Sequence, residues 1–127
     1  MRVVDAADAL AELTQVSSEI EAAAIADDQG NVVAATRGDG DALAAAGRAL
    51  LDHAVRVQGR EAAQLEVATT AGSVFVVRED GRTIVATTAP EPSAGLVFYD
   101  LKNCLRALEA PNRKRRRTKT KEPVDEA

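Results

Sequence analysis

The sequence predicts an α+β fold in which helices pack on a five-stranded antiparallel sheet, in the order α-β-β-α-β-β-β-α. Two observations predict it. Three segments repeat apolar residues at helical spacing, and the β-like runs between them fall into a pair and a triplet. Short turns containing Gly join the runs within each group, and such turns connect antiparallel strands. A βαβ nucleotide-binding arrangement is therefore not expected.

Each element follows from its own signals. The run at residues 21–27 is rich in alanine and could prolong the first helix, but a strong turn at 27–31 and a following strand in need of a partner favour a strand. Asp41 or Asp39 is the expected N-cap of the second helix, and Gly59 its stop. Ser93 is expected to cap the third helix and Pro111 to end it. The expected helices cover residues 5–16, 41–57 and 93–111, and the expected strands cover 21–27, 32–36, 64–70, 73–78 and 83–88.

The core must be built from small aliphatic side chains. Apolar residues make up 46% of the 127 residues, yet Phe75, Phe98 and Tyr99 are the only aromatic ones. Such a core offers few deep pockets, so no cofactor or small-molecule substrate is expected. The single Cys104 cannot form an intramolecular disulfide, and no secretory signal or membrane-length apolar run is present. A cytoplasmic protein is expected.

The charge is divided between two segments. Residues 1–110 carry 17 acidic and 9 basic residues, and residues 111–127 are strongly basic. We expect a domain at 1–110 and a disordered tail at 111–127, because the tail has too few apolar residues to fold. The polybasic residues are Arg113, Lys114, Arg115, Arg116, Arg117, Lys119 and Lys121. They could contact phosphates or an anionic membrane without sequence specificity, or an acidic protein surface, including this domain's own. Thr118 and Thr120 are candidate phosphorylation sites.

No residue pattern indicates catalysis or metal binding. His53 lacks neighbouring ligands for a tetrahedral metal, and Asp27 and Asp28 fit a turn better than a calcium loop. Residues 38–40 lack the Gly-Lys-Ser/Thr ending of a phosphate loop. Cys104 falls on an apolar helix face, where a thiol acts as a small hydrophobic group. We therefore predict a protein that is not an enzyme.

The sequence resembles the roadblock/dynein light-chain family over roughly residues 5–109. The resemblance lies in the amphipathic first helix, the strand-turn-strand pattern, the second helix, a later pair of strands and the opening of the last helix. The corresponding segments are residues 5–16, 21–35, 41–57, 74–77 with 84–86, and 95–97. Longin-like and profilin-like domains share a related layout.

The resemblance implies a function in protein binding. Members of the family are generally homodimers or heterodimers, in which the second helix and the central strand of the meander pack across a two-fold axis. Bacterial members are associated with small Ras-like GTPases, as activators or scaffolds. The resemblance therefore implies that this chain binds itself or a paralogous roadblock protein, and a GTPase that itself holds the nucleotide.

The second helix supports a dimer on its own pattern. Its apolar arc covers about half the circumference, wider than the stripe of roughly 100° that one sheet face requires. Leu43, Ala46, Gly47, Leu50, Ala54 and Val57 form the main stripe, and Ala44, Leu51 and Val55 extend it sideways. A partner is expected on the extra flank, although a loop or the third helix could cover it instead. The expected interface residues are Ala44, Gly47, Leu51, Val55, Val67 and Thr69.

Two functional hypotheses follow. The first is a dimeric regulatory adaptor of a small Ras-like GTPase; the second is a dimerisation module that presents the polybasic tail to nucleic acid or an anionic membrane. An arginine finger needs an exposed loop, and Arg37 and Arg82 are the candidates. We expect neither to act in this way, because an adaptor can order the partner's own catalytic loop.

Overall fold

The computed structural model describes residues 5–59 and 63–108, which form three helices and five strands. The polybasic residues and the two candidate phosphorylation sites lie outside these ranges. In chain order the elements are α1 (Ala6–Val16), β1 (Ile20–Ala26), β2 (Val32–Ala35), α2 (Gly40–Gln58), β3 (Gln64–Thr69), β4 (Gly72–Glu79), β5 (Arg82–Thr88) and α3 (Ala94–Arg106). The predicted element order is confirmed.

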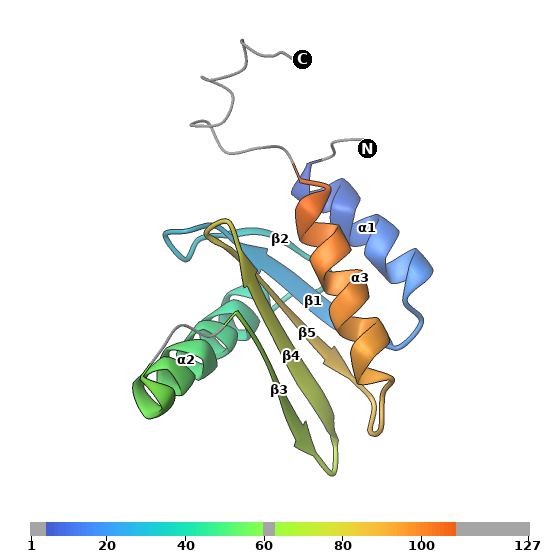
Figure 1. Cartoon of the computed structure of the whole chain (residues 1–127). Helices are drawn as coiled ribbons and strands as arrows, with labels where there is room; N and C mark the ends of the chain where they lie inside the picture. The colour runs from blue at the N-terminus through green and yellow to red at the C-terminus, as the bar shows by residue number, and fades with distance from the viewer. Residues whose placement is uncertain (1–4, 60–62, 109–127) are drawn as a thin grey trace, which may run out of the picture.

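The strands form one antiparallel sheet in the order β2-β1-β5-β4-β3. Figure 1 shows α1 and α3 side by side on one face of the sheet and α2 on the other. The predicted α+β fold is therefore confirmed, with the helices divided between the two faces. The three central strands are buried between helices, whereas β2 and β3 lie at the edges.

The face under α1 and α3 holds the larger part of the core. Phe75 of β4 is fully buried and meets the ring of Phe98 edge-on, with ring centroids 5.0 Å apart. Leu101 of α3 and Leu13 of α1 close over the same cluster, together with Ile25 of β1. The apolar residues at helical spacing in α1 and α3, and those at alternate positions of β4, therefore form one buried layer.

The alanine-rich run forms a strand because β1 lies between two helices. Contacts from α1 on one face and α2 on the other leave Ala23, Ala24 and Ala26 almost completely buried. Small side chains allow both helices to approach the strand closely. Pairing with β5 along the whole of β1 supplies the backbone hydrogen bonds that outweigh the helix propensity of alanine.

Helix α2 sits close to the sheet through small residues. Asp39 caps it by accepting a hydrogen bond from the N–H of Ala42 at 3.4 Å. Gly47 faces Val85 of β5 so closely that an added Cβ would lie 2.2 Å from the Val85 Cγ2 atom. One helical turn on, Leu51 is fully buried against Val85 and Val76. The helix therefore packs on β5 through a notch that only glycine leaves open.

The ends of α3 differ from the prediction. The helix ends at Arg106 and not at Pro111, because Ala107 and Leu108 donate to carbonyls three residues back and tighten the last turn. Ser93 occupies the N-cap position, but its side chain makes no capping bond. Its backbone N–H donates to both carboxylate oxygens of Glu19, at 3.2 Å each.

Two sheets can join only through strands that have a free edge, and the sheet order shows which strands have one. The central strand of the meander, β4, pairs with β3 on one side and β5 on the other, so it has no free edge. Strand β3 pairs with β4 alone and lies at the edge. Strand β2, at the other edge, pairs with β1 alone. A second sheet could therefore join this one only at β2 or β3, and β3 is the edge that belongs to the meander.

Replacement of Gly47 by Ala should destabilise the fold, although alanine has the higher helix propensity. Val85 is β-branched and cannot rotate away from the added Cβ, so overpacking should lower the free energy of unfolding by about 1–3 kcal/mol. Gly95→Ala, at an open position on α3, is the matched control and should be neutral or stabilising by up to about 1 kcal/mol. Urea denaturation measures both. Equal stability changes in the two variants would contradict this packing.

Candidate protein-binding surface

One flank of α2 and the neighbouring edge of the sheet share an apolar surface. Leu43 and Leu50 of α2, like Leu65 of β3 and Val74 of β4, are half-buried and pack against the buried cluster of Leu51, Val76 and Val85. Val67 of β3 lies opposite Val74 in the strand register and is also half-buried. We call these five half-buried residues the α2–β3 surface. Its apolar side chains are only partly covered within the chain.

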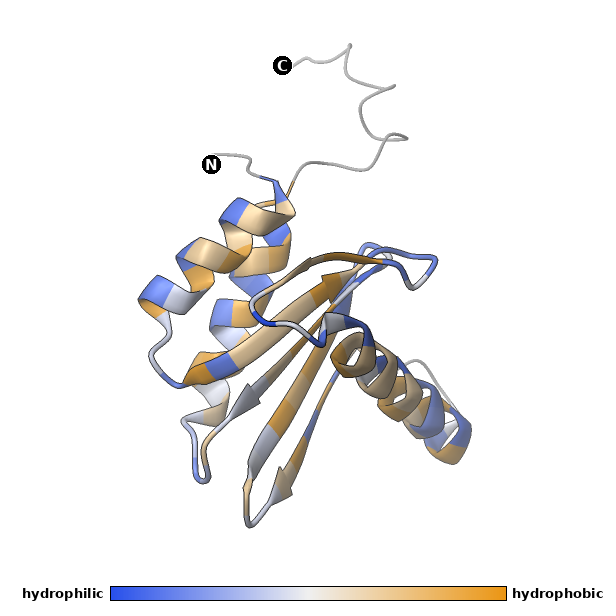
Figure 2. Ribbon diagram, turned by 180° about the vertical axis from the view of Figure 1, so that it is seen from behind, coloured by the Kyte–Doolittle hydropathy of each residue, from blue (hydrophilic) through white to orange (hydrophobic). Residues whose placement is uncertain are grey.

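The flank of α2 continues this surface toward its C-terminal end. Val57 lies two helical turns beyond Leu50 and is 69% exposed. Figure 2, viewed from the α2 side, shows α2 crossing this face while the β3–β4 hairpin extends past it. Contacts from α2 fall mainly on β5 and β1. Among the helices that the structure describes, none therefore has its main contacts on the β3 side of this face.

Three of the expected interface residues are used within the chain. Ala44, Gly47 and Leu51 face the sheet of their own chain and are buried there. The sequence interpretation assigned the small residues to a partner helix, whereas they allow α2 to approach β5. The stripe containing Leu43 and Leu50, which was assigned to the sheet, lies at the flank instead. Gly47, a member of the predicted main stripe, faces the sheet, but so do Ala44 and Leu51 from its side, whereas Leu43 and Leu50 of the main stripe stay half-buried.

The other expected interface residues remain accessible in part. Val55 and Val67 are half-buried, and Thr69 is exposed at the end of β3. Thr69 also shapes the β3–β4 turn: its hydroxyl donates to the Gly72 carbonyl at 2.9 Å and accepts from the N–H of Ala71 at 3.1 Å. Their place in an interface stays a prediction. Leu65 and Val74 were not expected, although their alternation along the strands marks them as facing one side.

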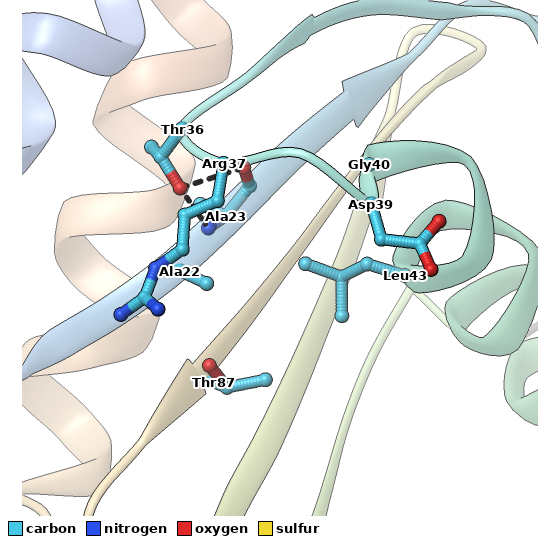
Figure 3. Close-up of a pocket in the computed structure, with 8 residues that line it drawn as sticks. All are labelled: Ala22, Ala23, Thr36, Arg37, Asp39, Gly40, Leu43 and Thr87. Carbon is cyan, nitrogen blue, oxygen red and sulfur yellow. Dashed lines mark hydrogen bonds between the residues drawn. The ribbon is translucent and has the colours of Figure 1, made fainter.

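A small hollow of about 240 Å³ lies beside the start of α2. Figure 3 shows Thr36 and Arg37 on one side and Leu43 with Thr87 on the other. The Thr36 hydroxyl donates to the Ala23 carbonyl at 3.3 Å and accepts from the Ala23 N–H at 2.9 Å. These bonds continue the pairing of β1 beyond the end of β2, so the polar groups here serve the sheet.

The two candidate arginine fingers differ in where they lie: Arg37 is exposed in the loop between β2 and α2, whereas Arg82 is not in a loop. Arg37 lies along β1, where its guanidinium donates to the Glu21 carbonyl at 3.2 Å. Arg82 was expected in the turn after Asp80, but it is the first residue of β5, pairs with Glu79 in the register and is half-buried.

The remaining polar candidates have structural roles. Asp27 accepts hydrogen bonds from the N–H groups of Gln29 and Asn31, both at 2.9 Å, and these bonds lower the pKa of its carboxyl. Asp27 is therefore a turn former, as predicted. His53 is exposed on α2. Among residues 5–59 and 63–108, no cluster of His, Cys, Asp or Glu side chains is arranged to hold a metal ion. None of the helices described is long and apolar enough to cross a membrane.

Cys104 is buried between α1 and α3. Burial, with a smaller contribution from the negative charge of Glu12, raises the pKa of its thiol to about 12. The thiol therefore stays protonated at neutral pH and is a poor nucleophile, in keeping with the predicted role as a small apolar group.

Comparison with solved structures identifies the fold. A Roadblock/LC7 domain from Streptomyces avermitilis superposes with a TM-score of 0.70 at 18% identity, covering 82% of this chain and 94% of that one. This chain has the roadblock fold. The gliding protein MglB from Thermus thermophilus has a TM-score of 0.64 at 19% identity, covering 81% and 84%. Myxococcus xanthus MglB has a TM-score of 0.61 at 17% identity, covering 76% and 85%.

A profilin in a complex with rabbit actin also matches, at a TM-score of 0.58 and 14% identity, covering 78% of this chain and 91% of that one. The expected structural similarity to profilin-like domains is thus confirmed. No protein-family model matches the sequence, and no curated protein matches it. Sequence relationships therefore add nothing to the structural likeness.

Cys104 should resist thiol reagents in the folded protein. With a pKa near 12, very little thiolate exists at pH 8, whereas an unfolded cysteine ionises near its usual value of about 8.5. Modification by a chromogenic disulfide should be slow in buffer and at least tenfold faster in denaturing urea. Equal rates in the two conditions would show that the thiol is accessible in the native state.

Proposed function

We propose that this protein is a non-catalytic regulatory adaptor of the cytoplasm that forms a homodimer and binds a small Ras-like GTPase. The α2–β3 surface is the observation that carries the proposal. Leu43, Leu50 and Val67 there are apolar and only partly covered, next to an edge strand with unpaired backbone groups. Such a surface favours association with another protein.

A second copy of the chain fits this surface well. In a two-fold dimer the same patch faces itself, so β3 would run antiparallel to the partner's β3 and join the two sheets. The flanks of α2 that carry Leu43 and Leu50 would then close over the joined strands from both sides. In this arrangement the unpaired backbone groups of β3 would form hydrogen bonds, and the apolar flank of α2 would be covered. A paralogous roadblock chain would satisfy the same requirements.

The GTPase partner is supported by the fold. The chain has the roadblock fold, and bacterial members of the roadblock family, which its sequence resembles, are associated with small Ras-like GTPases. In this account the partner binds and hydrolyses GTP, and the dimer orders the partner's catalytic loop or holds it in a complex. The tail-based alternative depends on residues 113–121, which lie outside the described ranges.

Leu50→Glu should dissociate the dimer, because it places a charge in the apolar flank of α2 that the partner would cover. Ala49→Glu is the matched control: it adds the same charge one residue away, at an exposed position of the same helix. Sedimentation velocity should show monomers for the first variant and dimers for the second, with native circular dichroism in both. The same mass for both variants would place the interface elsewhere.

The tail and Arg37 should be dispensable for the GTPase. A protein lacking residues 112–127 and an Arg37→Ala variant should both bind a small Ras-like GTPase of the host and change its hydrolysis rate as the intact chain does. Single-turnover hydrolysis and a binding titration measure this. Loss of binding on tail deletion would favour the alternative hypothesis, and loss of stimulation with retained binding in Arg37→Ala would indicate an arginine finger.

A further inference from the structure

A second groove runs along the opposite side of the molecule, between α1 and α3. Ala9, Leu13 and Val16 of α1 and Cys104 and Ala107 of α3 supply its apolar surface. Val16 is 71% exposed, so the apolar surface continues onto the rim. Figure 1 shows the two helices side by side, with the last turn of α3 beside the first turns of α1. This groove has no part in the α2–β3 surface.

The walls of the groove are acidic. Glu12 and Asp100 line it from opposite helices, and Asp8 lies one turn from Glu12 on the same side of α1. None of the residues that line the groove is basic. Lys102 and Arg106 of α3 project from other sides of that helix, and Arg106 is paired with Glu79. The carbonyls at the C-terminal end of α3 add partial negative charge at the same end of the groove.

We propose that the basic segment at residues 113–121 of the same chain docks in this groove. The segment carries seven basic residues and no acidic one, so its charge complements the carboxylates of Glu12, Asp100 and Asp8. The aliphatic stems of lysine and arginine would cover the exposed Val16 and the half-buried Ala107 while their charged ends reach the carboxylates. A single mode of binding thus uses both the apolar floor and the acidic walls.

The connection along the chain favours this occupant over a foreign basic peptide. The described chain ends at Leu108, next to Ala107, which lines the groove, and the basic segment begins five residues later. Five residues span up to about 17 Å when extended, more than the roughly 10 Å that separates Ala107 from Asp100 along the helix. Tethering gives the segment an effective concentration in the millimolar range, which offsets weak individual contacts. Partners of the tail would have to displace it.

A spin label on the tail tests the proposal in the full-length chain. Thr118→Cys provides the attachment site, and the protonated, buried thiol of Cys104 leaves it as the reactive one. We expect the amide signals of Val16 and Asn103 to broaden severalfold more than those of Ala45 and Ala49 on α2. In about 1 M NaCl, where charges are screened beyond roughly 3 Å, the difference should disappear. The unsubstituted chain, treated with the same label, controls for reaction at Cys104.

Two variants and a mixing experiment decide the interpretation. Asp8→Asn combined with Asp100→Asn should abolish the selective broadening, whereas Asp41→Asn, which removes an exposed charge from α2, should leave it unchanged. No broadening at the groove in low salt, or equal broadening over α2, would overturn the proposal. A mixture of two chains is the last test: one carries the isotope and no spin label, and the other carries the spin label and no isotope. Broadening of the groove signals in this mixture would also overturn the proposal, because the tail would then bind a second copy.

Discussion

The close contact of α2 with β5 determines how the rest of the molecule is arranged. Gly47 and Ala44 allow the helix backbone to approach the sheet, and Leu51 fills the space beside Val85. A helix held there covers β1, β5, β2 and part of β4, whereas β3 lies outside its main contacts. Leu65 and Val67 therefore stay half-buried, on a strand that the sheet order leaves at the edge. The same contact that completes one core thus creates the surface proposed for association.

The two faces of the sheet differ in how completely their apolar side chains are buried. The α1–α3 face is closed by large side chains, above all Phe75 and Phe98, and its edge carries a two-point ion pair between Arg106 and Glu79 at 3.1 and 2.9 Å. That pair is exposed to solvent and screened by salt, so the apolar layer supplies most of the stability. The α2 face is only partly closed. The surface proposed for association therefore lies on the α2 face, whose apolar residues are only partly covered.

The sequence predicts most of this fold because its local signals agree. Glycine turns and apolar periodicity place the elements within a few residues, and the exception is the C-terminal end of α3. The strand nature of β1 is less evident, since alanine favours helices and only the helices packed on both faces explain it. Local patterns do not report which helix covers which strand. For that reason the sequence reveals a wide apolar arc on α2 but does not reveal which side of it meets the sheet.

The sequence therefore predicts an apolar surface that involves the second helix and β3, but it identifies only some of the residues in that surface. Val67 and Thr69 could be assigned to β3 from the sequence, and the position of β3 at the edge depends on the sheet order. Leu65 and Val74 belong to the surface because the cross-strand register turns them to the same side as Val76, where they pack against the cluster that also contacts Leu50. Register is a long-range property, and it is decided by packing across the whole sheet.

The central claim is that the α2–β3 surface is covered by a second copy of the chain. The most direct test is the solution mass of the full-length protein, measured by light scattering after size exclusion over a wide range of concentrations. A constant mass of twice the 13.3 kDa chain is the predicted result. A constant mass of 13.3 kDa would contradict the claim, because the β3 edge would then remain unpaired in solution.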